Sequence, residues 1–347
     1  MTEATELNVY AGDAAPILVE VTRGGMVECT HRGIAAVTDS DGKIVHSWGD
    51  VSRLTFARSA IKPLQALPVF ESGAADAFGL ANHEVSLCCA SHSGEPMHVD
   101  TVVAWLERLG LGVDDLECGP QLPVREVSAH ALIKAGIEPT KAHNNCSGKH
   151  SGMLTTAVHL GEPTKGYSSD DHPVQKRLRA LIEEMSGDDL SGVPTGYDGC
   201  GIPIFGVSIK GLATAMARFA DPSNQSTERQ AAIKRIVECC AEHPLMIAGT
   251  GRFNSAVLTE TGTKCLLKGG AEGVYMAALP DLGLGVALKI DDGSSRGSER
   301  AMGAILKKLG IIDEAMEATL ADQLKAPVRN WAGRLVGEVR PAGSAAF

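Results

Sequence analysis

The chain has 347 residues, of which 44% are hydrophobic and 39 are glycine, and its formal net charge at pH 7 is −10. This length and composition are typical of a compact α/β or α+β protein with a sizeable core. The acidic balance without a basic stripe argues against nucleic acid or anionic membrane partners, and no window holds the eighteen apolar residues of a membrane span. The N-terminal stretch lacks the basic start and apolar centre of a secretory signal, so we expect a cytoplasmic protein.

Strands are predicted near the start of the chain and helices after them. Three segments rich in β-branched residues lie within residues 16–48, and "DSDGK" supplies a turn between the last two. From residue 59 to about 241 the apolar residues follow mainly a helical period, most clearly over 99–110, 172–187 and 226–244. The segment "PIFGVSI" is an exception and is predicted to be a short strand.

Strands return late in the chain, at 264–270, 273–279 and 284–290, before a last helix at 298–310. Neither end alone supplies a full sheet, so we expect the terminal segments to pair in one antiparallel sheet. The predicted organisation is an α+β protein with a sheet-containing domain from residues 1–58 and 242–347. A mainly helical domain from residues 59–241 is inserted between them, and the active site is expected at their junction.

A serine and a lysine stand three positions apart in "FARSAIKPLQA", residues 56–66. Residues i and i+3 share a helix face, so Ser59 and Lys62 can meet if the helix starts near Ser59, which Pro63 supports. A serine hydroxyl becomes a nucleophile when a base removes its proton, and a lysine with a lowered pKa can be that base. The bare pattern is more often a helix cap and a solvated lysine.

The order of the polar motifs favours catalysis. After the first motif comes a loop, "SHSGEP", which begins at Ser91, and far downstream Lys268 precedes two glycines on a predicted strand. Ser-x-x-Lys, then a loop serine, then Lys-x-Gly on a late strand is the order found in serine β-lactamases and penicillin-binding proteins. Those folds also combine a sheet from both chain ends with a helical insertion.

Five segments carry a more specific resemblance. "FARSAIKPLQALP", "SHSGEP", "NNCSGKHSGML", "YDGCGIP" and "KGGAEGV" resemble the asparaginase II family of the rhizobial type, over roughly residues 16–310. This resemblance implies a serine β-lactamase-like fold, unrelated to that of the threonine-dependent asparaginases. It also implies hydrolysis of L-asparagine to L-aspartate and ammonia, and a homodimer.

The resemblance further implies two Ser-Lys pairs, Ser59 with Lys62 and Ser91 with Lys268. Ser59 would attack the side-chain amide carbonyl and form an ester that water then cleaves, although the sequence leaves open which pair acts first. Backbone N–H groups near Ser59 would stabilise the oxyanion, and Arg58 would hold the substrate carboxylate.

The nine cysteines are an odd number and include two adjacent pairs, a usage that predicts reduced, mostly buried thiols. Two of them suggest a zinc site: Cys146 and Cys200 would supply sulfur, and chemistry alone favours His150 as the nitrogen ligand, because lysine must lose its proton to bind a metal. The resemblance instead implies Cys146, Lys149 and Cys200 as ligands. It places His150 and Asp198 close by, where we expect them to bind substrate.

Several alternatives stay open. "DDGSSRG" fits the nucleophile-elbow pattern, but no histidine follows Ser295, so we interpret Ser295 and Ser298 as turn and helix-start residues. A serine hydrolase of the penicillin-recognising class, acting on peptides or lactams, would share the Ser-Lys chemistry. A zinc-binding protein of the same fold without activity is a third possibility.

Overall fold

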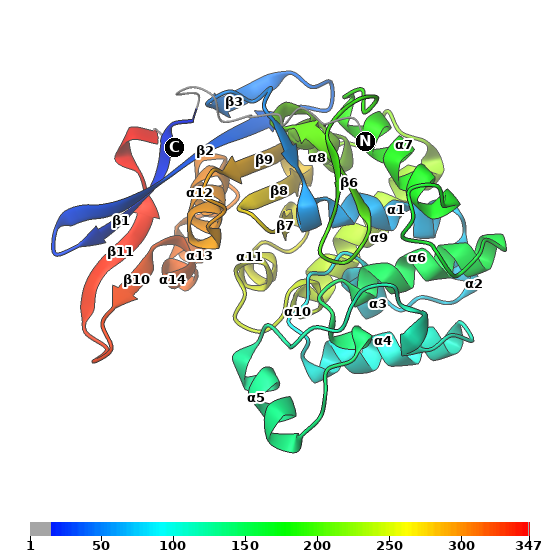
Figure 1. The fold of residues 1–347 in the computed structure, drawn as a ribbon. Coiled ribbons are helices and arrows are strands. Elements are labelled where there is room, and N and C mark those ends of the chain that lie inside the picture. The colour runs from blue at the N-terminus through cyan, green and yellow to red at the C-terminus, as the bar shows by residue number, and fades with distance from the viewer. Residues whose placement is uncertain (1–14, 346) are drawn as a thin grey trace, which may run out of the picture.

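The structure is a computed structural model that describes residues 15–345 and residue 347. The N-terminal residues on which the cytoplasmic prediction partly depends therefore lie mainly outside the described part. Within that part, a large sheet occupies one half of the molecule and most helices occupy the other (Figure 1). Its strands are β1 (Ile17–Arg23), β2 (Met26–Thr38), β3 (Ile44–Trp48), β7 (Leu266–Gly269), β8 (Val274–Leu279), β9 (Leu284–Ile290), β10 (Ala326–Arg329) and β11 (Leu335–Pro341).

The large sheet is antiparallel and joins both ends of the chain. Its order is β10-β11-β1-β2-β9-β8-β7, with β3 also paired to β2. The central junction is β2 with β9, where Ala35 lies opposite Leu288. The strands of this sheet come only from residues 17–48 and 266–341, so the predicted α+β class and the pairing of the terminal segments are confirmed. The domain boundaries at 58/59 and 241/242 stay a prediction.

A second, small sheet lies beside the helices. It has the order β4-β6-β5, from β4 (Leu54–Phe56), β5 (Thr195–Tyr197) and β6 (Pro203–Ser208). The predicted strand in "PIFGVSI" is thus confirmed as β6. The strand β4 leads directly into the segment that carries Ser59, so pairing with β6 fixes where that segment starts.

The helices form around buried apolar faces, as the periodicity predicted. Helix α8 packs on β2, β8 and β9, and α12 contacts β1, β9 and β11. The predicted helices appear as α4, α7, α9 and α12. The α-helices are α1 (Lys62–Glu71), α2 (Ala74–Ala77), α3 (Asn82–Cys88), α4 (Pro96–Arg108), α5 (Glu126–Ala135), α6 (Ser147–Leu160), α7 (Pro173–Ser186), α8 (Ile209–Ala220), α9 (Thr227–Glu242), α10 (Pro244–Ile247), α11 (Phe253–Thr261), α12 (Ser295–Lys308), α13 (Glu314–Thr319) and α14 (Ala321–Leu324).

Short 3₁₀ helices connect many of these elements. They are η1 (Arg58–Ile61), η2 (Val113–Asp115), η3 (Lys141–His143), η4 (Gly262–Lys264), η5 (Pro280–Leu282) and η6 (Gly343–Ala345). Helix α5 differs from its neighbours, because it buries none of its residues and projects from the helical side of the molecule (Figure 1).

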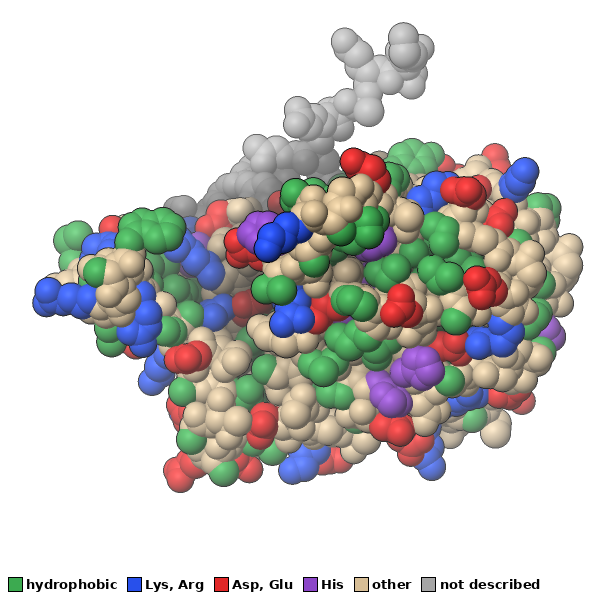
Figure 2. Space-filling view, turned by 90° about the horizontal axis from the view of Figure 1, so that it is seen from below, with side chains coloured by type: hydrophobic (Ala, Val, Ile, Leu, Met, Phe, Trp, Pro, Cys, Tyr) green, Lys and Arg blue, Asp and Glu red, His purple; other side chains and the backbone are tan. Residues whose placement is uncertain are grey.

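Three further predictions can be compared with the structure. All nine cysteines lie within the described residues without a disulfide bond, and eight of them are buried, as predicted; their reduced state stays a prediction. Across the described residues, every helix is too short or too polar to span a bilayer. Acidic and basic side chains are mixed over the face seen in Figure 2, without a continuous basic area.

Candidate active site

The segment that carries Ser59 is a tight connection between a strand and a helix. After β4, the 3₁₀ helix η1 runs from Arg58 to Ile61, and α1 begins at Lys62 with Pro63 in its first turn. The predicted helix start near Ser59 is therefore confirmed, with a 3₁₀ turn in front of the α-helix. Arg58 has a φ of 49°, a left-handed conformation that is costly for a residue with a side chain.

Lys62 is fully buried and donates to three acceptors. Its Nζ reaches Ala90 O, lies 3.0 Å from Ser91 Oγ, and lies 3.1 Å from Cys146 Sγ. We predicted the Ser59 hydroxyl as its partner, but the only hydrogen bond between the two residues in the described structure is from the backbone N–H of Lys62 to Ser59 O, and none joins their side chains. A buried ammonium needs acceptors around it, and the three available ones draw Lys62 towards Ser91.

Ser91 lies between two lysines from distant parts of the chain. Lys268, on β7, places its Nζ 2.9 Å from Ser91 Oγ and 2.6 Å from Gly269 O. Burial, and then the positive charge of Lys62, hold the pKa of Lys268 well below its usual range. The hydroxyl of Ser91 therefore has next to it an amine that favours the neutral form, which is the state a general base requires.

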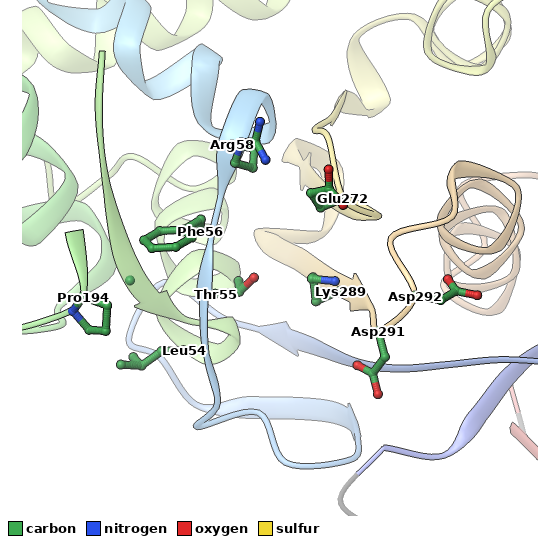
Figure 3. Close-up of a pocket in the computed structure, with 10 residues that line it drawn as sticks. Leu54, Thr55, Phe56, Arg58, Pro194, Glu272, Lys289, Asp291 and Asp292 are labelled. Atoms are coloured by element: carbon green, nitrogen blue, oxygen red, sulfur yellow. The ribbon is translucent and has the colours of Figure 1, made fainter. Parts of the chain in front are cut away.

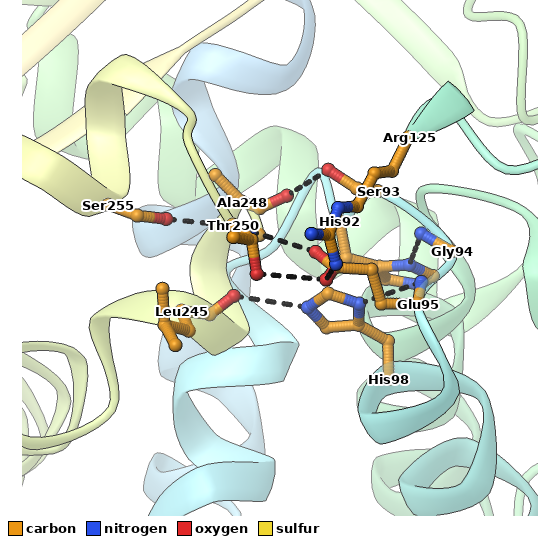
Figure 4. A network of polar contacts seen from close by, with 11 residues as sticks. His92, Ser93, Gly94, Glu95, His98, Arg125, Leu245, Ala248, Thr250 and Ser255 are labelled. Atoms are coloured by element: carbon orange, nitrogen blue, oxygen red, sulfur yellow. Dashed lines mark hydrogen bonds and ion pairs between the residues drawn. The ribbon is translucent and has the colours of Figure 1, made fainter. Parts of the chain in front are cut away.

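The loop that follows Ser91 is fixed by two stacked, buried histidines (Figure 4). The backbone N–H of Gly94 donates to His92 Nδ1, and that of Glu95 donates to His98 Nδ1. Both rings are therefore acceptors at Nδ1. Burial lowers the pKa of both histidines, that of His92 strongly, which keeps the rings neutral and the loop closed.

The same loop is anchored to the segment before α11. The carboxylate of Glu95 accepts hydrogen bonds from the backbone N–H of Thr250 at 2.8 Å and from its hydroxyl at 2.9 Å, and it also pairs with Arg125. Ser93 Oγ donates to Ala248 O at 2.7 Å. These contacts hold the Ser91 loop against residues 248–250, and so they set the position of the Ser91 hydroxyl (Figure 4).

A cavity of about 320 Å³ brings the predicted catalytic residues together. Ser59, Ser91 and Lys268 line it, and Gly270 closes over Ser59, because a side chain at that glycine would meet the backbone N of Ser59 and of Ala60. The rest of the wall of this cavity is mainly polar, and its residues were not predicted from the sequence. It includes Asn145, Arg252, Asn254, Tyr275, Ser295 and Glu299.

A second polar cluster lies on the other side of Lys62. Lys149 Nζ, on α6, is 3.0 Å from Cys200 Sγ, and Cys146 is hydrogen-bonded to the same thiol. The hydrogen bond from Cys146, and then the charge of Lys149 acting against burial, lower the pKa of Cys200 to about 4. The hydrogen bond to Cys200 and burial raise the pKa of Cys146 to about 12.

The nearby charges favour one ion pair in this cluster. Burial opposes the charge of Lys149, but Cys200 and Cys146 outweigh it and raise the pKa of Lys149. Without metal, the cluster is therefore a Cys200 thiolate beside a Lys149 ammonium. Two sulfur atoms and a nitrogen meet here, which is a donor set that suits tetrahedral zinc with one position left open. The residues present fit such an ion.

The two nitrogen candidates differ in their surroundings. His150 is buried, its Nδ1 lies 2.7 Å from Tyr167 Oη, and its Nε2 is buried without a hydrogen bond in the described structure. Burial, with Lys149 beside it, lowers the pKa of His150 to about 3, so the ring is neutral. No group of three or more His, Cys, Asp or Glu side chains in the described residues could hold a metal, so any zinc site here depends on lysine or on a pair of thiols.

Arg58 and Asp198 are joined to each other. Arg58 Nε donates to Asp198 Oδ1 at 2.8 Å, and Asp198 follows β5 in the loop that also carries Cys200. Burial opposes ionisation of Asp198, but Lys149 and Arg58 outweigh it and lower the pKa of the carboxyl. The predicted substrate-binding pair thus lies between the serine that follows Arg58 and the thiol cluster.

Comparison with models of known protein families identifies the family of this chain. The L-asparaginase II family model matches residues 19–341, so the chain belongs to the L-asparaginase II family. This membership makes the chain a hydrolase that acts on a small molecule. No curated protein matches the chain.

Some solved structures with a similar arrangement of helices and strands are described as β-lactamases. One from Mycobacterium bovis is 15% identical, with a TM-score of 0.40, and the match covers 80% of this chain and 94% of that one. Another from Sphaerobacter thermophilus DSM 20745 is 13% identical, with a TM-score of 0.39, and the match covers 83% of this chain and 92% of that one.

Sequence reasoning missed the far wall of the catalytic cavity. Arg252 lines it and makes no side-chain hydrogen bond or ion pair within the described residues, whereas the guanidinium of Arg58 is already engaged by Asp198. The only signal in the sequence was "GTGRFNS", a glycine-rich turn with a basic and an amide residue at the start of α11.

Proposed function

We propose that the chain is an L-asparaginase, which hydrolyses L-asparagine to L-aspartate and ammonia. The observation that carries this proposal is the placement of Ser91 Oγ between the amines of Lys62, at 3.0 Å, and Lys268, at 2.9 Å, in one cavity with Ser59. Family membership supports the choice of substrate. The alternatives, a penicillin-recognising hydrolase and an inactive zinc-binding protein, have no comparable observation in their favour.

In the proposed mechanism, Ser59 is the nucleophile. Its Oγ attacks the side-chain carbonyl carbon of asparagine, while its proton passes by way of Ser91 to Lys268, whose lowered pKa suits a base. The lysine returns the proton to the amide nitrogen, the C–N bond breaks, and ammonia leaves behind an aspartyl ester on Ser59. Water then attacks the ester with the same base, which releases L-aspartate and restores the serine.

The surroundings of Ser59 suit the charge that develops on the carbonyl oxygen. The first backbone N–H groups of a helix have no intrahelical partner, and Ser59 stands in the first turn of η1. The closeness of Gly270 to the backbone N of Ser59 and of Ala60 leaves no room for a side chain above them. The N–H of Ala60 already donates to Ala57 O at 3.1 Å, whereas that of Ser59 has no acceptor among the described residues. We infer that the N–H of Ser59 contributes to the oxyanion hole.

For the zinc ion that the family resemblance implies, we propose Cys146, Lys149 and Cys200 as ligands. When bound, the ion would supply positive charge that holds the substrate. Arg58, Asp198 and His150 lie at or beside this cluster and would contact the substrate's charged groups. Comparing zinc content in Lys149→Met and His150→Ala would decide between the two nitrogen candidates, because only the variant that lacks the true ligand loses the metal.

The proposal is tested by ammonia release from L-asparagine with the wild type and with Ser59→Ala. We expect the variant to lose at least about a thousandfold in turnover while its circular dichroism spectrum stays unchanged. Rapid quenching of the wild type with substrate, followed by mass spectrometry, is expected to show an aspartyl ester on the peptide that contains Ser59. Unchanged turnover in Ser59→Ala, or an ester on another residue, would remove Ser59 from its role.

A further inference from the structure

A second cavity, of about 400 Å³, lies apart from the catalytic one, between the small sheet and the end of β9 (Figure 3). Its volume falls in the range of small-molecule sites in proteins. Residues from four parts of the chain meet around it, which makes it a property of the fold and not of one loop. The lining residues are Leu54, Thr55, Phe56, Arg58, Pro194, Gly206, Glu272, Lys289, Asp291 and Asp292.

One side of this second cavity is apolar. Leu54 and Phe56 come from β4, and Pro194 precedes β5. Figure 3 shows these three side chains together on the left of the cavity, opposite the charged residues. Such a surface suits a hydrocarbon or aromatic group on the ligand.

The opposite side has a buried lysine that makes no direct ion pair within the described residues. Lys289, on β9, is only 7% exposed, and the one acceptor for its Nζ among the described residues is Ile290 O. An ammonium has three donors, so two are left for a ligand. Burial lowers the pKa of Lys289, although the charges of Asp291, Glu272 and Asp292 act in the opposite direction.

The carboxylates of the cavity are not equivalent. Asp291 is paired with Arg53, and Asp292 lies 2.6 Å from His31 Nδ1, so both have partners. Glu272 makes no hydrogen bond or ion pair within the described residues. Its φ of 58° is left-handed, a strained conformation of the kind that clusters at functional sites.

Among the described residues, the groups of this cavity without a direct ion pair are therefore the amine of Lys289 and the carboxylate of Glu272, and they face an apolar wall. We propose that the cavity binds an α-amino acid with an apolar side chain. The ligand carboxylate pairs with Lys289, with the terminal nitrogens of Arg58 beside it. The ligand ammonium pairs with Glu272, and the ligand side chain packs against the apolar wall. This proposal concerns binding only, and it does not depend on the asparaginase activity.

The position of this site gives it contact with the catalytic cavity. Arg58 is the neighbour of Ser59 in the chain, and Glu272 lines both cavities. A ligand held by these two residues therefore shares Glu272 with the wall of the catalytic cavity and Arg58 with the proposed contacts of the substrate.

The test is isothermal titration of the full-length protein with L-phenylalanine, 3-phenylpropanoate and 2-phenylethylamine. We expect L-phenylalanine to bind with a Kd of about 1 mM or tighter, and the two analogues, each of which lacks one charge, to bind at least about tenfold more weakly. Lys289→Met is expected to weaken L-phenylalanine binding at least about tenfold. Thr55→Phe, which fills the cavity from a half-buried strand position and leaves the lysine intact, is expected to abolish it.

Two variants serve as controls. Lys264→Met removes an exposed lysine outside the cavity, and Ser91→Ala changes the catalytic cavity; both are expected to bind L-phenylalanine like the wild type. The proposal is overturned if the wild type binds no L-phenylalanine at about 10 mM. It is also overturned if Ser91→Ala loses binding as Lys289→Met does, because the ligand would then occupy the catalytic cavity, or if Lys289→Met and Thr55→Phe both bind normally.

Discussion

Two buried lysines in this molecule, Lys268 and Lys149, have pKa values that are shifted in opposite directions. Lys268 faces a neutral hydroxyl and another amine, and its pKa falls well below the usual range. Lys149 faces two thiols and a carboxylate, and its pKa rises although it is equally buried. Burial disfavours both charges, so the difference comes from the partners. The same residue type thus favours the neutral amine in one place and the charged half of an ion pair in the other.

The largest expected effect comes from removing the base. Lys268→Met keeps the size of the side chain and abolishes the amine, so we expect asparagine turnover to fall by about a thousandfold or more. Lys264→Met, four positions earlier and exposed, is the matched control and should keep full activity. If both variants turn over asparagine like the wild type, Lys268 is not the base and the contrast between the two lysines has no catalytic meaning.

The next prediction concerns the Cys200 thiolate, which lies beside Lys149, the second lysine of the comparison. Cys200→Ser takes away the largest of the charges that raise the pKa of Lys149, so that pKa should fall. It also removes a proposed thiolate ligand, so zinc affinity should fall by at least about a hundredfold. Metal content after dialysis against zinc measures this. Cys265→Ser is the control, because the Cys265 thiol is also buried and its pKa is raised by burial alone. Equal zinc in both variants would contradict the ligand set.

A smaller effect is expected at the far wall of the catalytic cavity. Arg252→Gln removes the guanidinium there, which makes no hydrogen bond or ion pair in the described part of the chain, and we expect KM for L-asparagine to rise about tenfold with little change in kcat. With L-asparaginamide, which lacks the α-carboxylate, the variant and the wild type should have similar kcat/KM. A fall in kcat with KM unchanged would mean that Arg252 does not hold the carboxylate.

The smallest expected effect concerns pH and the loop that follows Ser91. Burial lowers the pKa of His92 well below 6.5, with the charges of His98, Lys62 and His143 adding to it, so the folded protein binds fewer protons than the unfolded chain. The contribution of His92 to the free energy of unfolding is then fully present above about pH 6.5. Below that pH the contribution falls, by up to about 1.4 kcal/mol per pH unit for one such group.

Urea unfolding at pH 7.5 and pH 5.5 measures this dependence. His92→Asn should flatten it, because an amide does not titrate. His130→Gln, at an exposed position on α5, should keep it. An unchanged slope in His92→Asn would assign the acid sensitivity to other groups.

Much of the fold follows from the sequence. The strands at 17–48 and 266–290 and the amphipathic helices are marked by periodicity, and the terminal pairing follows because neither half makes a sheet alone. Strands β10 and β11 were not predicted. They contain Pro327, Gly337 and Pro341 and are partly exposed, so neither alternation nor composition marks them as strands. Their pairing with β1 depends on long-range contacts that a local pattern does not contain.

The candidate site was likewise predicted only in part: the sequence indicated several of its residues but not the contacts among them. Motif order and family resemblance gathered Ser59, Lys62, Ser91 and Lys268, but not the hydrogen bonds among them. The spacing of Ser59 and Lys62 suggested a pair, whereas Lys62 turns to Ala90, Ser91 and Cys146, because three acceptors surround it. Arg252 and Glu272 were missed, because nothing local distinguishes a pocket residue from a surface one. The functional roles of all these residues stay predictions.

The contact between Lys268 and Ser91 spans 177 positions of the chain. Lys268 lies more than three quarters of the way along the 347-residue chain, so a ribosome must synthesise that much of the polypeptide before the amine can reach the hydroxyl. A nascent chain that ends before β7 has the alcohol without its proposed base, and a proteolytic fragment that stops there is in the same condition. The proposed hydrolytic activity can therefore appear only late in synthesis.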